Sequence, residues 1–250
     1  MKGLKKLLVT TAAMAVPFLV ASPANAVIQL GFALDSSGSI GTADYNVIKN
    51  GLASAIEALI PTDSSYEISM VNFSSTSTTV VSAVVIDSIA TRTLVADAIR
   101  ASVAFNGGTA FAPALNGLAA AFASSNQTIT ATYINFATDG VNGDTAATAT
   151  ARTNLINAGL DNLSLEGIGG GVNVNYLTTA MCYPTPCDQT SPYNFPAQGF
   201  YIAVPDAAAY VAAIQNKIRT VVQPTPEPGT LALFGLSMLG LGLMRRKATA

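Results

Sequence analysis

The chain has 250 residues, half of them hydrophobic, and no His. Between its two ends, six basic side chains stand against thirteen acidic ones, which are all the Asp and Glu residues except Glu227 (basic: Lys49, Arg92, Arg100, Arg152, Lys217, Arg219). An acidic domain repels phosphate backbones, so we expect no nucleic-acid partner. No His is present to activate Ser36, Ser37 or Ser39 as a nucleophile, and no phosphate-binding G-x-x-x-x-G-K-[ST] loop is present, so we expect no enzyme.

The amino terminus has the three parts of a secretory signal peptide. Lys2, Lys5 and Lys6 form a basic region, residues 7–21 form an apolar run, and Ala24-Asn25-Ala26 is a small-residue cleavage site. We expect residues 1–26 to be removed on export. The alternative is an uncleaved membrane anchor, for which the apolar run is short.

The first half of the remaining chain alternates apolar runs with amphipathic stretches. Residues 27–34 predict a strand buried on both sides, and residues 44–59 predict a helix. Residues 66–73 and 78–86 predict two strands rich in Val, Ile and Thr. The linker between these two strands is too short for a parallel crossover, so they should form an antiparallel hairpin at a sheet edge.

The second half continues the alternation. Helices are expected at 91–103, 113–123, 146–158 and 206–221, strands at 130–137, 163–168 and 200–204, and a turn at Asn106-Gly107-Gly108. The fold class is therefore α/β: a three-layer, doubly wound, mostly parallel central sheet with one antiparallel edge strand. We expect a single domain over residues 27–223, with residues 169–199 as an ordered loop insertion.

Two cysteines, Cys182 and Cys187, lie in that insertion among four prolines. Export would place them in an oxidising compartment, where a local disulfide persists, so we predict that they pair. Two free thiols or half a metal site is the weaker alternative, because the chain has no His and no other Cys.

Oxygen-bearing side chains follow two of the predicted strands. Asp35, Ser37 and Ser39 come directly after the first strand, and Asp139 follows the strand at 130–137. Thr109 closes the Gly107-Gly108-Thr109 turn that leads into a helix. The carboxyl ends of parallel strands meet at one edge, where ligands bind in open α/β sheets. Two carboxylates and three hydroxyls, with no soft ligand, would select Mg²⁺, Mn²⁺ or Ca²⁺ over Zn²⁺. For the first of these segments alone, a polar turn with a capping Ser is an equal alternative.

These segments and their order resemble the metal-ion-dependent adhesion site (MIDAS) of von Willebrand factor type A (VWA) domains. The resemblance implies that Ser37, Ser39 and Thr109 coordinate a divalent metal ion directly, with Mg²⁺ as the first expectation. It also implies that Asp35 and Asp139 act directly or through water. An open coordination position would then accept an acidic oxygen from a protein or polysaccharide partner.

The carboxyl terminus has a second three-part pattern. Pro226-Glu227-Pro228 precedes an apolar run at 231–244 and a basic end, Arg245-Arg246-Lys247. A helix over the apolar run would rise about 20 to 23 Å, short of the roughly 30 Å of a bilayer core, so it could cross only with local thinning or snorkelling. The pattern over residues 224–250 resembles the PEP-CTERM sorting signal of Gram-negative bacteria, which implies processing by an exosortase. An ordinary tail anchor is the alternative, and both put the domain outside the cytoplasm.

Together these features predict an exported protein of the cell surface or extracellular matrix of a Gram-negative bacterium, held in the membrane at least transiently by its carboxyl-terminal segment. Its expected function is to bind a partner through the metal site. The alternative is a structural component of an exopolysaccharide or biofilm matrix whose metal site is vestigial or only stabilising. A hydrolase with a site near the cysteine loop is a third, weaker hypothesis.

Overall fold

The computed structural model describes residues 26–222. The expected signal peptide, except Ala26, and the expected sorting tail lie outside the described residues. The strands are β1 (Val27–Asp35), β2 (Tyr66–Phe73), β3 (Ser77–Val85), β4 (Ile129–Thr138), β5 (Asn162–Ile168) and β6 (Tyr201–Val204). The helices are α1 (Gly41–Leu59), α2 (Ile89–Ala101), α3 (Phe111–Ala123), α4 (Thr145–Asn157), α5 (Val174–Tyr176) and α6 (Ala207–Val222).

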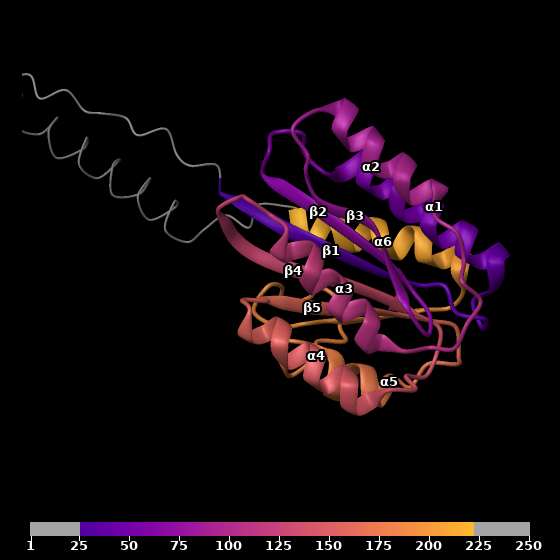
Figure 1. The fold of residues 1–250 in the computed structure, drawn as a ribbon. Helices are drawn as coiled ribbons and strands as arrows, with labels where there is room; N and C mark the ends of the chain where they lie inside the picture. Colours follow the sequence, from indigo (N-terminus) through magenta and orange to yellow (C-terminus); the bar gives the residue numbers. More distant parts are fainter. Residues whose placement is uncertain (1–25, 223–250) are drawn as a thin grey trace, which may run out of the picture.

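The six strands form one sheet in the order β3-β2-β1-β4-β5-β6. Neighbouring strands are parallel except β2 and β3, which are antiparallel and leave β3 at the edge. Helices cover both faces of the sheet (Figure 1). The predicted fold class, a three-layer α/β fold with one antiparallel edge strand, is therefore confirmed.

Each face of the sheet has its own hydrophobic core. Successive side chains of a strand point to opposite faces, so in β1 Phe32 packs with α1, α2 and α6, whereas Ala33 packs with α3 and α4. Gly31 shows how closely α3 approaches. A Cβ at this position would lie 2.5 Å from Cζ of Phe122. The near-continuous apolar sequence of β1 thus reflects burial on both faces.

Several helices begin earlier than the sequence pattern predicts. Helix α2 begins at Ile89 because the Ser88 hydroxyl accepts a hydrogen bond from the Thr91 amide (3.1 Å) and caps the helix. Helix α3 begins at Phe111, so that Pro113 lies in the first turn, where its missing N–H costs nothing. These differences are confined to element ends and leave the topology unchanged.

The segment 169–199 contains more regular structure than its sequence indicates. It holds the short helix α5 and a π-helical turn, Leu177–Met181. The turn buries Leu177 and Met181 in the core on the α3 and α4 side of the sheet. Tyr183 pairs with Leu163 of β5 in an isolated antiparallel bridge. The segment is thus packed onto the sheet through both apolar contacts and backbone hydrogen bonds.

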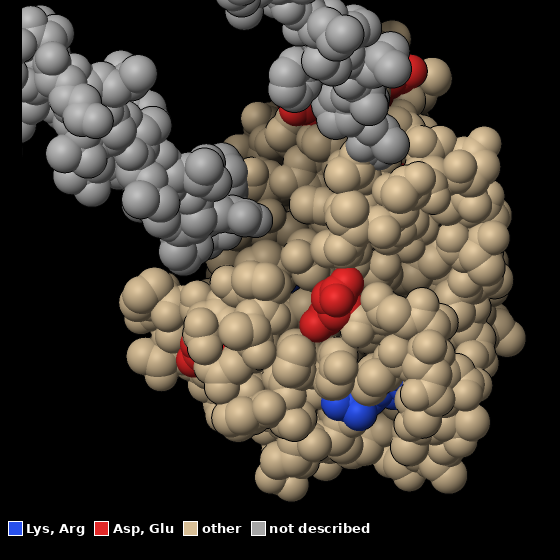
Figure 2. Space-filling view, turned by 90° about the vertical axis from the view of Figure 1, so that its left-hand side faces the viewer, with Lys and Arg blue, Asp and Glu red and all other residues tan. Residues whose placement is uncertain are grey.

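The end of the molecule that carries the amino ends of the strands is largely uncharged on its surface (Figure 2). Within residues 26–222, no helix combines the length and the apolar character needed to cross a membrane. The apolar run predicted at 231–244 lies beyond the part of the chain that the structure describes.

Candidate metal centre

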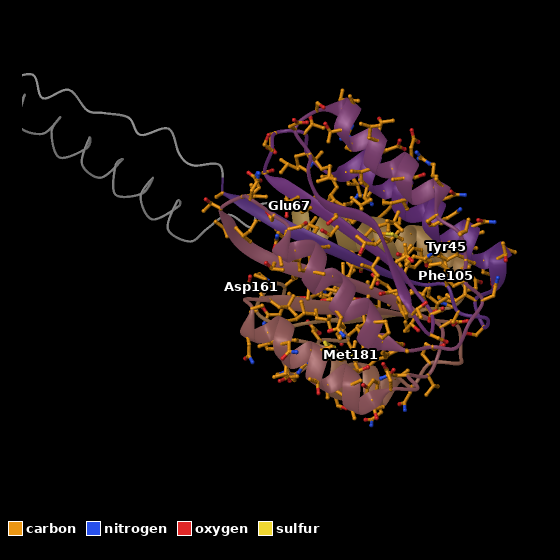
Figure 3. All side chains as sticks on the ribbon, viewed as in Figure 1. Tyr45, Glu67, Phe105, Asp161 and Met181 are labelled. Carbon is orange, nitrogen blue, oxygen red and sulfur yellow. A yellow bond between two sulfur atoms is a disulfide. The ribbon has the colours of Figure 1, made fainter. Side chains whose placement is uncertain are left out.

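Three loops meet at the carboxyl edge of the sheet, the end of the molecule where Figure 3 labels Tyr45 and Phe105. The first loop follows β1, the second lies between α2 and α3, and the third follows β4. Strands β1 and β4 are adjacent and parallel, so their last residues, Asp35 and Thr138, lie side by side. The loop between α2 and α3 crosses over them. Its Asn106 amide donates to the Ser36 carbonyl (3.0 Å), and its Gly107 carbonyl accepts from the Gly38 amide (2.8 Å).

Three of the predicted ligands form a continuous chain of contacts. The hydroxyl oxygens of Ser37 and Ser39 are 3.1 Å apart, and the Ser39 hydroxyl donates to Asp139 Oδ1 (2.7 Å). Asp35 joins this group because its Oδ1 accepts from the Ser37 amide (2.8 Å). The structure therefore brings side chains from the first and third loops to one point.

Thr109 approaches the same point from the second loop. Its side chain lies against Gly140, the residue after Asp139, so closely that a Cβ on Gly140 would be 2.8 Å from Thr109 Oγ1. The Thr109 carbonyl accepts from the Gly143 amide (2.9 Å), which fixes the second loop to the third. Among the described residues, no hydrogen bond joins the Thr109 hydroxyl to the other four predicted ligands.

The charges at this edge are unbalanced. Burial raises the pKa of Asp35, and the nearby charge of Asp139 raises it further. Burial also raises the pKa of Asp139, to which the charge of Asp44 contributes. The three loops, residues 35–44, 102–110 and 138–145, contain no Lys or Arg. A cation placed here would therefore relieve the cost of holding two partly buried carboxylates close together.

Sequence reasoning missed the role of Thr138. Its hydroxyl is fully buried, donates to Asp35 Oδ2 (2.6 Å) and accepts from the Gly140 amide (3.1 Å). It therefore fixes the carboxylate of Asp35 and the start of the third loop at once. The only signal in the sequence was its position immediately before Asp139.

Asp144 was also missed, although it supports the second loop. Its carboxylate accepts hydrogen bonds from the Phe111 amide (3.0 Å) and the Ala112 amide (3.2 Å), at the start of α3. These amides have no partner within the helix, and a carboxylate at a helix amino terminus is favourable. Asp144 thus anchors α3, and with it Thr109, to the loop that carries Asp139.

The donor set fits a hard divalent cation. Two carboxylates and three hydroxyls are oxygen donors of the kind that Mg²⁺, Mn²⁺ and Ca²⁺ prefer. Within residues 26–222, no three His, Cys, Asp or Glu side chains cluster as they would in a site built from those residues alone. Any metal site at this edge would therefore depend on the Ser and Thr hydroxyls as well as on Asp35 and Asp139.

The predicted disulfide between Cys182 and Cys187 is present, and it closes a loop beside α4. The Arg152 guanidinium donates to the carbonyls of Met181 and Cys182 (both 2.8 Å) and so holds this loop to the helix. The nearby Asp188 carboxylate accepts from the amides of Thr190 and Asn194. These polar groups are engaged in holding the backbone, which fits a structural role for the cysteine loop.

A cleft of about 590 Å³ opens at the opposite end of the sheet, between α3 and α4. Its lining includes Gln29, Phe122, Thr132 and Asp161. The Asp161 carboxylate accepts from the Thr132 amide (2.8 Å), and Thr132 in turn donates to the Gln29 side chain (3.2 Å). The polar groups of the cleft therefore hydrogen-bond to one another, in contrast to the carboxylates at the carboxyl edge, which have no basic side chain in the three loops to balance their charge.

Solved structures with the same fold are VWA domains. Proximal thread matrix protein 1 from the mussel byssus matches with a TM-score of 0.61 and 16% identity, over 79% of this chain and 49% of that one. A von Willebrand factor type A protein from Catenulispora acidiphila matches with a TM-score of 0.58 and 18% identity, over 78% and 42%. This chain thus spans less than half of either protein. Manganese-loaded TRAP from Plasmodium vivax matches with a TM-score of 0.55 and 22% identity, over 78% and 74%.

Residues 25–167 match the DUF1194 family, described as proteins of unknown function, and the chain belongs to that family. Residues 224–247 match the PEP-CTERM protein-sorting motif, which indicates an exported protein sorted to the cell surface. A search of curated proteins by sequence gives no match.

Proposed function

We propose that this protein, at the cell surface, binds a divalent cation at the carboxyl edge of its sheet and uses the cation to hold an acidic group of a partner. The ligands would be Asp35, Ser37, Ser39, Thr109 and Asp139. The observation that carries the proposal is the run of contacts from Ser37 through Ser39 to Asp139, with Asp35 and Thr109 beside it. No catalytic role is proposed for these groups.

Mg²⁺ is the cation that the donor set favours, because all five side chains offer hard oxygen atoms. Mn²⁺ or Ca²⁺ would also suit them. Among proteins with this fold, TRAP has been solved loaded with manganese, and the mussel byssus protein with zinc in a MIDAS motif. When bound, the cation would supply an electrophilic centre for a carboxylate. The chain's own residues would hold that centre, and the three loops contain no Lys or Arg that would compete with it for the carboxylate.

The surface around the site favours a protein partner. Val103, Val141 and Val174 are 66%, 56% and 41% exposed, and they belong to segments that carry or touch the candidate ligands. Gly171, three residues before Val174, lies so close that a Cβ there would be 2.9 Å from the Asp139 carbonyl oxygen. Exposed apolar side chains around a polar centre are typical of interaction surfaces.

Charge points in the same direction. The exposed Asp44 lies within electrostatic reach of Asp139, and the three loops offer no basic side chain. A densely anionic polysaccharide would be repelled by this edge except at the cation itself. A protein segment with one carboxylate among apolar side chains would place its charge on the cation and its apolar groups on the valines. A neutral or sparsely charged polysaccharide is the competing partner.

The sorting motif supports a surface or matrix location in a Gram-negative bacterium. In this proposal an exosortase processes the carboxyl-terminal segment, which holds the protein in the membrane until it is cleaved. The acidic domain then faces away from the cytoplasm, so the metal site would be open to divalent cations outside the cell.

Calorimetric titration of the purified protein with Mg²⁺, Mn²⁺ and Ca²⁺ tests the proposal. We expect binding in the millimolar range or tighter, lost in Asp35→Ala and retained in Asp161→Asn, which removes an acidic group from the opposite end of the sheet. A pull-down from surface extracts with and without chelator then tests the partner. If the cation raises the melting temperature but changes no partner binding, the protein is a matrix component with a stabilising site. If no cation binds, the proposed function is wrong.

A further inference from the structure

Three polar side chains are buried together between the sheet and α6, away from the candidate metal centre. They are Asn135 of β4, Glu166 of β5 and Lys217 of α6, with exposed fractions of 6%, 0% and 4%. Alternation along β4 places Ile134 and Phe136 in the core on the α3 side, so Asn135 faces α6. The function proposed above uses none of the three.

Two of the three groups line one small cavity, and the third, Glu166, contacts one of them. Lys217 Nζ lies 3.1 Å from Glu166 Oε1. Asn135 and Lys217 both line a cavity of about 20 Å³, together with the aromatic rings of Phe195 and Phe200. Lys217 Nζ lies 5.0 Å from the centre of the Phe200 ring. The amine and the amide therefore line one small, largely apolar cavity.

Among the described residues, the amide of Asn135 makes no well-formed hydrogen bond, although it lies close enough to the buried Tyr210 hydroxyl to affect the pKa of that group. Within residues 26–222, neither its nitrogen nor its oxygen makes a hydrogen bond of good geometry. It is nevertheless close enough to Glu166 to lower the pKa of that carboxyl, against the larger opposing effect of burial. Buried amides without partners are rare, because leaving such a group unpaired costs about 1 to 3 kcal/mol.

Burial also favours the uncharged forms of the other two groups. It raises the pKa of Glu166 and lowers the pKa of Lys217 to about 8. A neutral amine is a nucleophile, and a neutral carboxyl group can donate a proton. An amine, a proton carrier and a carboxamide without a well-formed hydrogen bond in the described part of the chain are thus buried together.

The geometry points to an intramolecular isopeptide bond between Lys217 and Asn135, formed with Glu166 as the proton carrier. The neutral Nζ of Lys217 attacks Cγ of Asn135, and a new C–N bond forms. Glu166 donates its proton to the leaving amide nitrogen and takes one from the attacking amine, so it is unchanged at the end. The bond from Cγ to Nδ2 breaks, and one molecule of ammonia leaves.

The reaction needs nothing that the chain does not hold. No electron is transferred, no metal or cofactor takes part, and the protein loses only the atoms of ammonia. Proximity lowers the barrier, because groups held near one another react as if at very high concentration. The product also removes the ionisable amine from the interior, and with it the cost of burying that charge.

The bond would tie the last helix to the middle of the sheet. Helix α6 ends at Val222, two residues before the matched sorting motif at 224–247. A force applied to the domain through that end would reach α6 first. A covalent link from α6 to β4, which pairs with β1 and β5, would transmit the force into the centre of the fold instead of peeling the helix away.

Mass spectrometry of a tryptic digest of the purified, disulfide-reduced protein tests this proposal directly. Asn135 lies in the peptide 101–152, and cleavage at Lys217 ends the peptide 153–217. Because trypsin does not cleave after an acylated lysine, we expect peptide 101–152 joined to 153–219, at their summed mass less one ammonia. If both peptides appear separately, with cleavage after Lys217, the proposal is overturned.

Two variants give matched controls. Lys217→Met removes the amine and the cleavage site, so it should yield free 101–152 and free 153–219. Glu166→Gln keeps the shape of the side chain but removes the proton carrier, so the linked species should fall at least tenfold at the same time after folding. Circular dichroism would show whether each variant is folded. Full linkage in folded Glu166→Gln would overturn the role of Glu166. The digest detects the link whether or not the protein binds metal, so it is independent of the proposed function.

Discussion

The candidate metal centre and the Asn135–Glu166–Lys217 cluster place polar groups in opposite situations on the same sheet. At the carboxyl edge, the Ser39 hydroxyl is exposed and the carboxylates of Asp35 and Asp139 have hydrogen-bond donors. In the cluster, Glu166 and Lys217 are enclosed and Asn135 has no good partner among the described residues. One site can exchange its hydrogen bonds for a ligand from solvent, whereas the other cannot.

This difference suggests different uses. At the edge Asp35 and Ser37 are buried, but Ser39, Thr109 and Asp139 are at least partly exposed, and these three can release their present contacts at little cost because water or a cation replaces them. Enclosed groups lack that exchange, so chemistry that removes a charge is the more effective relief. The two proposals follow this difference: reversible binding at the edge and a permanent internal bond in the cluster.

Glu166→Ala tests the enclosed site with the largest expected effect. It removes the proton carrier of the proposed bond, so Lys217 stays an unlinked amine buried without its carboxyl partner, and we expect a loss of about 3 to 5 kcal/mol in the free energy of unfolding. Urea denaturation followed by circular dichroism measures this loss. In the double variant Glu166→Leu with Lys217→Met no charge is left stranded, and most of the ion-pair cost should be recovered. A single-variant loss below about 1 kcal/mol would mean that the pair is hydrated, and would erase the contrast between the sites.

Cation binding should stabilise the edge by a smaller amount. At a free Mg²⁺ concentration of about 100 times Kd, we expect a gain of about 2.7 kcal/mol, measured by thermal denaturation with and without chelator. Asp35→Ala should show no gain, and Asp161→Asn should keep it. An equal gain in Asp35→Ala would place the cation elsewhere.

The same gain should depend on pH. The cation needs both carboxylates ionised, and burial raises the pKa of Asp35 and of Asp139 in the metal-free fold. Protons therefore compete with the cation at a higher pH than at ordinary carboxyl groups, whose pKa is 3.8. Cation affinity should be full at neutral pH and fall as the pH drops through the raised values. An affinity that stays constant down to pH 4 would mean that the carboxylates are not ligands.

Thr138→Val tests whether the buried hydroxyl positions Asp35. Removing the donor to Asp35 Oδ2 should lower cation affinity about 10- to 100-fold, a typical effect of groups that orient metal ligands. Thr138→Ser retains the hydroxyl and should restore most of the affinity. Titration calorimetry measures both. An unchanged affinity in folded Thr138→Val would show that the Asp35 carboxylate needs no such support.

The sequence predicts the edge well because its signals are local. Strand 66–73 is recovered without error, and β1 and β4 are found within one or two residues, since apolar, β-branched and aromatic residues dominate each segment. Once parallel strands are inferred, residues that follow them must share an edge. Asp35, Ser37, Ser39 and Asp139 could therefore be grouped from their positions alone.

The enclosed cluster could not be predicted in the same way. Asn135, Glu166 and Lys217 come from three separate elements, and each looks in sequence like an ordinary polar residue. Only the register of β4 with β5 and the rotation of α6 bring them together. The π-helical turn Leu177–Met181 was missed for a related reason, because its buried side chains are held by contacts with the sheet and not by local propensity.

A surface ion pair supplies the smallest effect and a reference for the other four predictions. Arg100 of α2 contacts Glu57 of α1, and both side chains are one-third exposed. Hydrogen bonding to Arg100 lowers the pKa of Glu57 below its ordinary value of 4.5. The stability that this pair contributes is thus present above pH 4.5 and is lost as the pH falls through the lowered pKa.

Because solvent screens the Arg100–Glu57 pair, Arg100→Ala should cost about 0.2 to 1 kcal/mol near neutral pH in urea denaturation. The cost should shrink in high salt and in acid, and Arg219→Ala, which removes a basic group with no acidic partner among the described residues, should cost less. If Arg100→Ala lost as much stability as Glu166→Ala, burial of a charged pair would not be what sets the stability lost on breaking it.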